Sequence, residues 1–484
     1  MGSAPFRARV PTGGLAVLVA VVAWLTTACA GHASKTLEAR SALDANEPRR
    51  ALSLLNEAMD VKSAKELPQK VGGDNVLFIL DRSMVLQELG NYELSSRDLQ
   101  LSDKQIQLLD FSRNALDDLG KYVFSDESGP YKAPAYEKLM INTINMVNYL
   151  AQGDLEGSRV EARRLAVMQQ YMESKKDPSE ALNGPGSYLA GFTFEKSGNA
   201  SEALRYYDEA LQYGDYKSLY DPIRRLAKRS SYRSPRIRRI MGELPGAKRP
   251  AAPPADPAPD TDRSDPPADA TGSEKAPPPP LPDNSAELLV IVNYGRVPAK
   301  YAKRIPIGLA LTYASGAISP YNEARANRLA LQGLVTWVNY PALGRSHGEY
   351  GLPEFALDGS WRPLEGICAV DKEVERAWKK MRGAVIASAI TRAVARIVAG
   401  EATRRAVKGW EGLLLSLGTQ VALTAADTPD TRSWATLPAR MAFGRVRLPP
   451  GTHSVFLRAR GMRQKQRISL DPGGWAVVAL TVLR

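Results

Sequence analysis

The stretch that decides the fold is Tyr188-Leu-Ala-Gly-Phe-Thr-Phe-Glu-Lys-Ser-Gly-Asn-Ala-Ser-Glu-Ala-Leu-Arg-Tyr-Tyr-Asp-Glu-Ala-Leu211. It predicts two antiparallel helices, because Gly198 is the residue type that ends a helix and starts a tight turn. Gly191 and Ala203 are small, as is required where two helices cross closely. Tyr207 is expected to fill the groove beside that crossing. The segment therefore predicts a helical hairpin with a closely packed interface.

This pattern resembles a tetratricopeptide repeat, a pair of antiparallel helices about 34 residues long. Three weaker copies share its pattern of a turn followed by a small residue. The small residues after the four turns are Ala51, Ser95, Ser158 and Ala203. Insertions or extra helices are expected between copies, because these residues are spaced more widely than one repeat. Since one helix pair cannot bury its own apolar face, residues 29–245 are predicted to stack as an all-α repeat domain. An irregular helical bundle without a repeat groove is the alternative.

Residues 246–286 are rich in proline, alanine and aspartate and contain no aromatic residue. Such a segment cannot bury enough apolar area to offset the entropy of ordering it, so we expect a disordered linker. Residues 287–484 are then predicted to form an α+β domain, with strands within 287–340 and 440–484 and helices within 370–426. The segments of residues 441–483 are separated by Gly/Pro turns, which is typical of antiparallel hairpins in a sandwich.

The individual strands and helices of this domain are predicted from apolar runs and their turn residues. The predicted strands are 287–294, 305–313, 334–339, 441–448, 454–460, 464–470 and 475–483, and the predicted helices are 370–398 and 401–425. The first helix begins amphipathic and from Ala384 onward is apolar almost all round, except for a narrow polar stripe of Ser388, Arg392 and Arg396. Buried arginines need partners, so we expect acidic groups near this stripe.

The N-terminus has the layout of a secretory signal, with two arginines followed by an uncharged apolar run at residues 13–28. This run is shorter than the roughly 20 residues that a spanning helix needs. Leu25-Thr-Thr-Ala-Cys29 resembles a bacterial lipobox, although leucine stands one place earlier than the motif favours. The resemblance implies a signal peptide of residues 1–28, lipidation of Cys29 and, since Ala30 follows, sorting to the outer membrane. The alternative is ordinary cleavage after Ala30, which would discard Cys29.

Residues 148–164, Asn-Tyr-Leu-Ala-Gln-Gly-Asp-Leu-Glu-Gly-Ser-Arg-Val-Glu-Ala-Arg-Arg, follow a Tyr136-Glu137 pair. Together they resemble the central motif of a family of uncharacterised bacterial tetratricopeptide-like lipoproteins, and residues 293–300 and 430–439 support the match. The resemblance implies export and lipidation and brings no assigned reaction.

The formal net charge of +12 predicts attraction to anionic surfaces. Much of it lies in the basic segment 224–239, which could contact anionic lipid or lipopolysaccharide, or could be a solvated helix that caps the repeats. Nucleic acid is not an expected partner, because export separates the chain from it.

A search for catalytic patterns favours a protein that is not an enzyme. None of the three histidines has the spacing of a zinc site, and the chain has neither a G-x-S-x-G elbow nor a P-loop, so we expect no metal and no cofactor. Cys368 is expected to be a packing residue. The alternative is a periplasmic hydrolase or a cell-wall-binding factor, in which Asp427, Asp430 and His347 or His453 would converge.

Two groups of residues are candidates for sites. The first is expected to line a repeat groove that binds envelope proteins, and it comprises Tyr149, Arg159, Arg163, Phe194 and Tyr207. The second is a clasp or ligand site, in which Asp427 or Asp430 would pair with Arg392 or Arg396 beside Arg432 and Trp434. The sequence thus predicts a non-catalytic lipoprotein that scaffolds partners at the periplasmic face of the outer membrane.

Overall fold

The computed structural model describes residues 32–111, 131, 133–175, 182–243, 284–332, 337–346, 350–406 and 429–484. The predicted signal peptide with Cys29, most of the predicted linker and most of the predicted helix 401–425 lie outside the described residues, as do Asp427 and His347.

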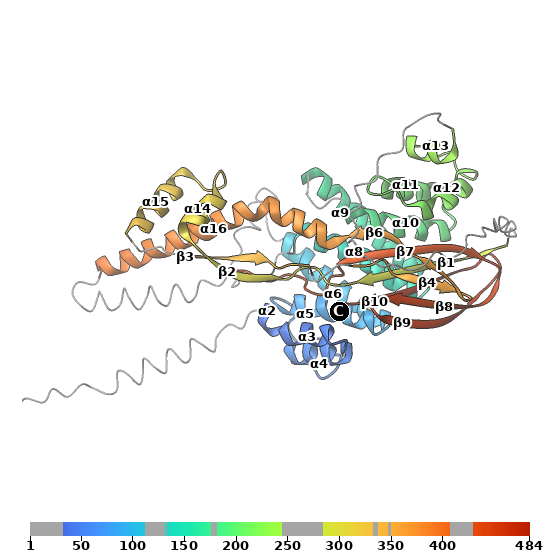
Figure 1. Cartoon of the computed structure of the whole chain (residues 1–484), viewed down its shortest axis with the longest axis horizontal. Helices are drawn as coiled ribbons and strands as arrows, with labels where there is room; N and C mark the ends of the chain where they lie inside the picture. Colours follow the sequence, from blue (N-terminus) through green and yellow to red (C-terminus); the bar gives the residue numbers. More distant parts are fainter. Residues whose placement is uncertain are drawn as a thin grey trace, which may run out of the picture.

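The first half of the chain is helical (Figure 1). Its helices are α2 (His32–Lys35), α3 (Leu37–Asp44), α4 (Pro48–Ala58), α5 (Asn75–Glu88), α6 (Tyr92–Phe111), α8 (Ala135–Ala151), α9 (Leu155–Lys175), α10 (Asn183–Lys196), α11 (Ala200–Ala210), α12 (Tyr220–Ala227) and α13 (Pro235–Met241), with a 3₁₀ turn at Lys217–Leu219. Four pairs of neighbours pack as hairpins, namely α3 with α4, α5 with α6, α8 with α9 and α10 with α11.

The four hairpins share one turn geometry. The turn residues have left-handed backbones, with φ of 62° to 81°, and are Asn46, Gly90, Gly153 and Gly198. After each of them the next backbone N–H donates to the carbonyl oxygen five residues earlier, at 2.8 to 2.9 Å. This is the hydrogen bond that closes a Schellman turn and satisfies a carbonyl at the helix end. The small residues that follow these turns, Ala51, Ser95, Ser158 and Ala203, are completely buried.

The second half contains two four-stranded sheets and a two-stranded ribbon. The first sheet has the order β10 (Trp475–Val482), β1 (Ala286–Tyr294), β7 (Arg440–Leu448), β6 (Glu365–Ala369). The second has the order β5 (Ser360–Pro363), β4 (Glu354–Leu357), β8 (Gly451–Ala459), β9 (Met462–Leu470). The ribbon pairs β2 (Lys300–Pro306) with β3 (Trp337–Leu343). The predicted strands after residue 440 are all present, but β10 pairs with β1 in parallel rather than continuing the antiparallel series.

The first sheet is the middle layer between the helices and the second sheet. Every residue of β1 is buried, and alternate side chains join two different cores. Leu289 and Ile291 belong to the core shared with the helices, whereas Leu288 and Val290 belong to the core between the two sheets. This is the period-two alternation of a strand that is covered on both faces. The run 287–294 is apolar because this strand is buried on both of its faces.

One core joins the two halves of the chain. The same cluster of buried side chains contains Phe78 and Tyr188 from the helices and Met441, Phe443 and Val477 from the first sheet. Separately cored domains were expected on either side of the proline-rich segment. The helices and the first sheet instead pack directly against each other, because the helical hairpins and the sheet each leave an apolar face to be covered.

An arm projects from this body (Figure 1). It consists of the β2–β3 ribbon, α14 (Ile307–Ala314), α15 (Pro320–Leu331) and the long helix α16 (Val370–Ala406), and it has a small core of its own. That core includes Ile305, Ala310, Val338, Ile386 and Ile390. None of the helices in the described part of the chain combines the length and apolar character needed to cross a membrane.

Three predictions for the arm were wrong in detail. The predicted strand 305–313 is a strand only up to Pro306, because α14 begins at Ile307 with that proline at its N-cap. The strand predicted at 334–339 is β3, which starts at Trp337 and runs on to Leu343, while residues 333–336 lie outside the described residues. The helix predicted to end at residue 398 continues through Gly400 to Ala406.

Candidate functional site

The residues predicted to line a partner groove do not form one surface. Tyr207 is fully buried and Phe194 is 8% exposed. Tyr149 is half-buried and its hydroxyl accepts a hydrogen bond from Gln100, whereas Arg163 is exposed and Arg159 pairs with Glu156 at the surface. Two of the five residues are therefore part of the interior, and the other three face outward or lie near α6.

The inner face of the helical hairpins is covered by the protein's own first sheet. The helices on this face are α5, α8 and α10, the first helix of three hairpins, and each has a run of twelve residues that are all buried. The Tyr188 ring of α10 packs edge-on against Phe443 of β7, with centroids 5.1 Å apart, and Phe192 packs likewise against Trp475 of β10 at 5.8 Å. In the folded chain this face is not open to a partner.

A polar network crosses the same interface between α5, α8 and the sheet. The Gln87 amide oxygen accepts hydrogen bonds from Asn293 Nδ2 at 3.0 Å and Thr481 Oγ1 at 2.8 Å. Gln87 Nε2 donates to Asn148 Oδ1 at 2.8 Å, and Asn148 Nδ2 donates to Ser95 Oγ at 2.9 Å. These groups are buried, so each hydrogen bond is needed to offset the loss of water and together they fix the register of sheet on helices.

The segment 430–436, which was predicted to clasp a C-terminal helix to the sheet, is hydrogen-bonded to the N-terminal helices α5 and α8. Trp434 is fully buried; its backbone N–H donates to Glu137 Oε1 at 3.1 Å and its indole Nε1 donates to the Leu80 carbonyl at 3.2 Å. Thr436 donates to Asp81 Oδ1 from its backbone N–H at 3.0 Å and from its hydroxyl at 2.8 Å. The connection after α16 is thereby fixed to α5 and α8.

Of the residues predicted for the ion pairs of the clasp, Asp430 pairs with its close neighbour Arg432, and Asp427 lies outside the described residues. Both carboxylate oxygens of Asp430 accept hydrogen bonds from the guanidinium of Arg432, at 2.9 Å each, and Arg432 is 1% exposed. Arg392 lies on α16 and donates to Ser388 Oγ at 3.0 Å. The side chain of Arg396 lies outside the described residues. Asp430 lies only two residues before Arg432, so a short turn of chain brings its carboxylate to the buried guanidinium. The prediction had considered only partners on a distant helix.

A buried ionic cluster that the sequence reasoning missed joins β7 and β1 to α10 and α11. The Arg445 guanidinium donates to Glu195 Oε2 and Glu287 Oε1, both at 2.6 Å, and to the Tyr207 hydroxyl at 2.8 Å. Burial opposes the charge on Arg445, but the two carboxylates raise its pKa well above the usual value. Burial likewise opposes ionisation of Glu287, but Arg445 holds the pKa of Glu287 well below its usual range. Tyr207, predicted for a groove, is a member of this cluster.

The residues considered for a hydrolase do not converge where they are described. His453 Nδ1 lies 2.7 Å from Asp358 Oδ2 at the surface, while Asp430 is engaged with Arg432. Burial raises the pKa of the Cys368 thiol, so this cysteine is held in its neutral form. Across the described ranges, no three His, Cys, Asp or Glu side chains are grouped so that they could hold a metal ion.

About half of the basic segment 224–239 is used within the fold. Arg225 pairs with Asp221 and Glu287, and Arg236 pairs with Asp208 at 2.8 Å. Arg238 and Arg239 are exposed in the last turn of α13, where cations interact favourably with the helix dipole.

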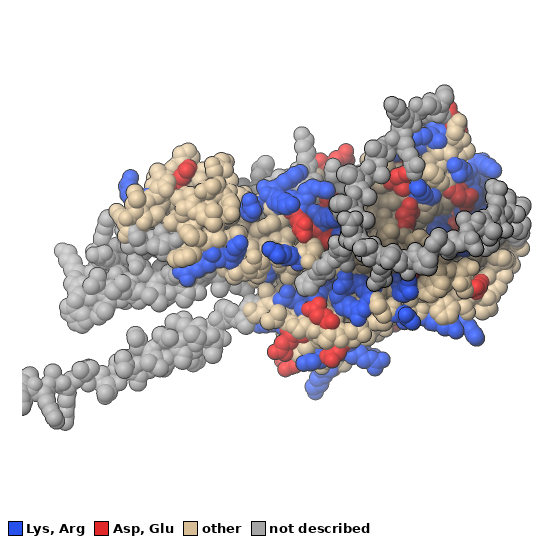
Figure 2. Space-filling view, in the orientation of Figure 1, with Lys and Arg blue, Asp and Glu red and all other residues tan. Residues whose placement is uncertain are grey.

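The arm carries the densest group of exposed apolar side chains in the described part of the chain. Its exposed large side chains are Tyr301, Leu309, Tyr313, Tyr321, Leu331 and Trp337. Cations lie over three of the aromatic rings: Arg304 is 5.4 Å from the Trp337 centroid, and Arg382 and Arg325 lie over Tyr313 and Tyr321. In Figure 2 the visible face of the arm is mostly neither acidic nor basic, with a basic patch along one edge. This surface is the candidate binding site.

Comparison of the chain with models of known protein families and with curated proteins returned no match.

Proposed function

We propose that this protein is an exported, lipid-anchored and non-catalytic scaffold of the bacterial envelope, and that its arm is the surface that binds an envelope protein. The supporting observation is the cluster of exposed aromatic and aliphatic side chains on the arm, with Leu331 91% and Tyr321 68% exposed. Exposed apolar groups gathered on one module are typical of protein interaction sites. Tyrosine, tryptophan and arginine are also the residue types that contribute most to binding energy at interfaces.

The helical hairpins support a tetratricopeptide-like interpretation of residues 32–243. The recurring left-handed turn residue and the buried small residue after it are what such repeats need. In this proposal the face on which a repeat array would hold a peptide is taken by the protein's own sheet. The array therefore acts as a rigid support, and the partner binds elsewhere.

In this proposal a lipid anchor on Cys29 holds the rigid body at the outer membrane, and the support for it is the lipobox resemblance of residues 25–29. Metabolic labelling with a fatty-acid analogue tests it directly. Cys29→Ser is expected to abolish the label, and a label that persists in this variant would contradict the anchor.

Site-specific photocrosslinking in cells tests the binding surface. A photoreactive amino acid is placed at Trp337 or Tyr321 on the arm and, as a matched control, at Trp361 on β5, which is also about half exposed at 52%. We expect a discrete adduct with an envelope protein at the two arm positions and not at Trp361. The same adducts at all three positions, or none at the arm, would contradict the proposal.

A further inference from the structure

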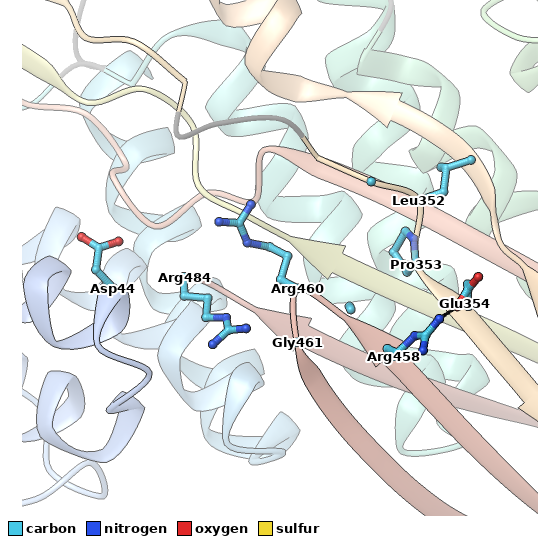
Figure 3. Close-up of a pocket in the computed structure, with 10 residues that line it drawn as sticks. Asp44, Leu352, Pro353, Glu354, Arg458, Arg460, Gly461 and Arg484 are labelled. Carbon is cyan, nitrogen blue, oxygen red and sulfur yellow. Dashed lines mark hydrogen bonds and ion pairs between the residues drawn. The ribbon is translucent and has the colours of Figure 1, made fainter. Parts of the chain in front are cut away.

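A broad cavity of about 760 Å³ lies between the end of α3, the segment that leads into β4 and the turn that joins β8 to β9 (Figure 3). Its volume is in the range of small-molecule sites. The lining includes three arginines, Arg458, Arg460 and Arg484, and two acidic residues, Asp44 and Glu354. This cavity lies on the body of the protein and its role would be separate from that of the arm.

Both acidic residues of the lining are paired with arginines other than Arg460 and Arg484. Asp44 Oδ1 lies 2.5 Å from Arg296 Nη2, and Glu354 forms an ion pair with Arg458. Arg460 and Arg484 form no ion pair with any acidic residue in the described ranges. In Figure 3 these two side chains lie in the middle of the cavity, with Asp44 at one end and the Arg458–Glu354 pair at the other. The centre of the cavity is therefore positively charged.

The fold positions both arginines. Arg460 occupies the β8–β9 turn with a left-handed backbone at φ 46°, and its guanidinium lies 4.7 Å from the centroid of the Tyr350 ring. Tyr350 in turn packs directly over Gly295, where a side chain would collide with the ring. Gly461 has φ of 74°, and a side chain there would collide with the Arg484 guanidinium. Two glycines thus make room for the contacts that hold these groups in place.

The two arginines are also partly shielded from water. Both are half-buried, and the buried Nε of Arg460 has no hydrogen-bond partner among the described residues. Burial lowers the pKa of Arg460, and the neighbouring Arg484 and Arg296 lower it further against the opposing effects of Tyr350 and Asp44. Gathering like charges costs free energy in the folded chain, and an anion bound between them would offset that cost.

We propose that this cavity binds the phosphate group of an anionic ligand through Arg460 and Arg484. Guanidinium groups bind phosphate and carboxylate oxygens by paired hydrogen bonds. One guanidinium fork matches the two coplanar oxygens of a carboxylate, whereas the terminal oxygens of a phosphate, three in a monoester and two in a diester, are arranged tetrahedrally and can accept from two arginines on different sides. The phosphate can belong to a soluble phosphate ester or to a phospholipid headgroup, and the ligand series below distinguishes these sources.

Isothermal titration calorimetry on the purified full chain in neutral detergent tests the site. The ligands are inorganic phosphate, glycerol 3-phosphate and dihexanoyl phosphatidylglycerol as a monomeric lipid. We expect the Arg460→Gln/Arg484→Gln double variant to bind the preferred ligand at least tenfold more weakly than the wild type. Arg467→Gln removes one charge from the exposed face of β9, outside the cavity, and should leave binding unchanged.

The ligand preference identifies the source. Arginine-dependent binding of glycerol 3-phosphate or inorganic phosphate indicates a soluble ligand, and arginine-dependent binding of the lipid alone indicates a headgroup. No binding of any ligand by the wild type would overturn the proposal. So would equal losses in Arg467→Gln and Arg460→Gln, because binding would then follow net charge. Melting temperatures of all variants, with Arg484→Gln as a second single variant, verify that each one is folded.

Discussion

Arg445 on β7 and Glu195 on α10 form an ion pair, with 2.6 Å between Nη2 and Oε2, in which both side chains are almost completely buried. The pair links the first sheet to the helical hairpins across the shared core. Two charges are removed from water here, which is tolerated only because each has several partners. Stability of the whole molecule should therefore depend on this contact.

Replacing Arg445 with methionine should destabilise the chain strongly. The change would remove the one fully buried cation from Glu195 and Glu287 and leave them only Lys196 and Arg225 at the edge of the cluster. Breaking a buried pair by removing one partner typically costs about 3–5 kcal/mol. Urea unfolding at pH 7 measures the difference. Arg467→Met, on the exposed face of β9, should change the free energy of unfolding by less than about 0.5 kcal/mol. Equal stability of the two variants would show that the cluster is not what joins sheet to helices.

Removing the carboxylate of Asp430 should also destabilise the fold. Asp430→Ala takes away both hydrogen bonds to the Arg432 guanidinium, which is 1% exposed. A loss of roughly 3 kcal/mol is expected, because the charge would remain buried without its bidentate partner, while the Asp74 carboxylate lies farther away at 3.5 Å. Thermal and urea unfolding, with the exposed Asp221→Ala as control, measure it. If Asp430→Ala had the same melting temperature as the wild type, the stabilising role of the Asp430–Arg432 pair would be contradicted.

Glu88 should make stability depend on pH. Its Oε1 accepts a hydrogen bond from the Leu483 backbone N–H at 3.2 Å, and burial raises its pKa to about 7. Because the pKa is higher in the folded chain than in the unfolded chain, the unfolded state releases this proton first as pH rises. The contribution of protonated Glu88 to the free energy of unfolding is therefore fully present below about pH 4.5 and is lost as pH rises through about 7.

Glu88→Gln keeps the hydrogen-bond acceptor and removes the titration. The variant should match the wild type at pH 4 and exceed it by up to about 3 kcal/mol at pH 8. Urea unfolding at both pH values gives the two differences. A constant difference between variant and wild type from pH 4 to pH 8 would rule out this role for Glu88.

The hairpin turns and the helix crossings should respond differently to a single methyl group. At Gly198 no atom would contact an added Cβ, so Gly198→Ala should cost only the left-handed backbone strain, about 1–2 kcal/mol. At Gly191 the Cβ would collide with the Tyr207 ring, which itself lies in the buried cluster. Gly191→Ala should therefore lower the melting temperature more than Gly198→Ala, and the reverse order would argue against the close crossing of α10 and α11.

The parts of the fold that could be predicted are the local ones. Gly198 and Ala203 lie within six residues of each other, and their roles as turn and crossing follow from nearby sequence alone. The parallel pairing of β1 with β10 joins Glu287 to Trp475, and no local pattern specifies a partner that far along the chain. At Pro306 an aliphatic run that is typical of a strand instead starts a helix, whose Ile307, Ala310 and Ala314 pack in the core of the arm.

The candidate sites were harder to predict than the fold. Tyr207 and Phe194 were placed on the correct helices, but the sequence does not show that the protein's own sheet covers the inner helical face. Glu287 offered a signal, since it is a carboxylate at the start of an otherwise apolar and fully buried strand, and such a group needs a buried cation. Arg460 and Arg484 offered no such signal in the sequence. Arg460 lies in the β8–β9 turn and Arg484 follows β10, and only the folded sheets bring the two side chains together.

The most direct measurement of the central claim, that helices and sheet share one core, is cleavage of the folded full chain within the proline-rich segment. A specific protease site is inserted between residues 253 and 280, and the cut protein is run on a sizing column under native conditions. We predict that the fragments carrying residues 32–243 and 284–484 elute together and unfold in one cooperative transition. Fragments that separate, each folded and each melting independently, would contradict the shared core. The inner face of the helices would then be open to bind a partner.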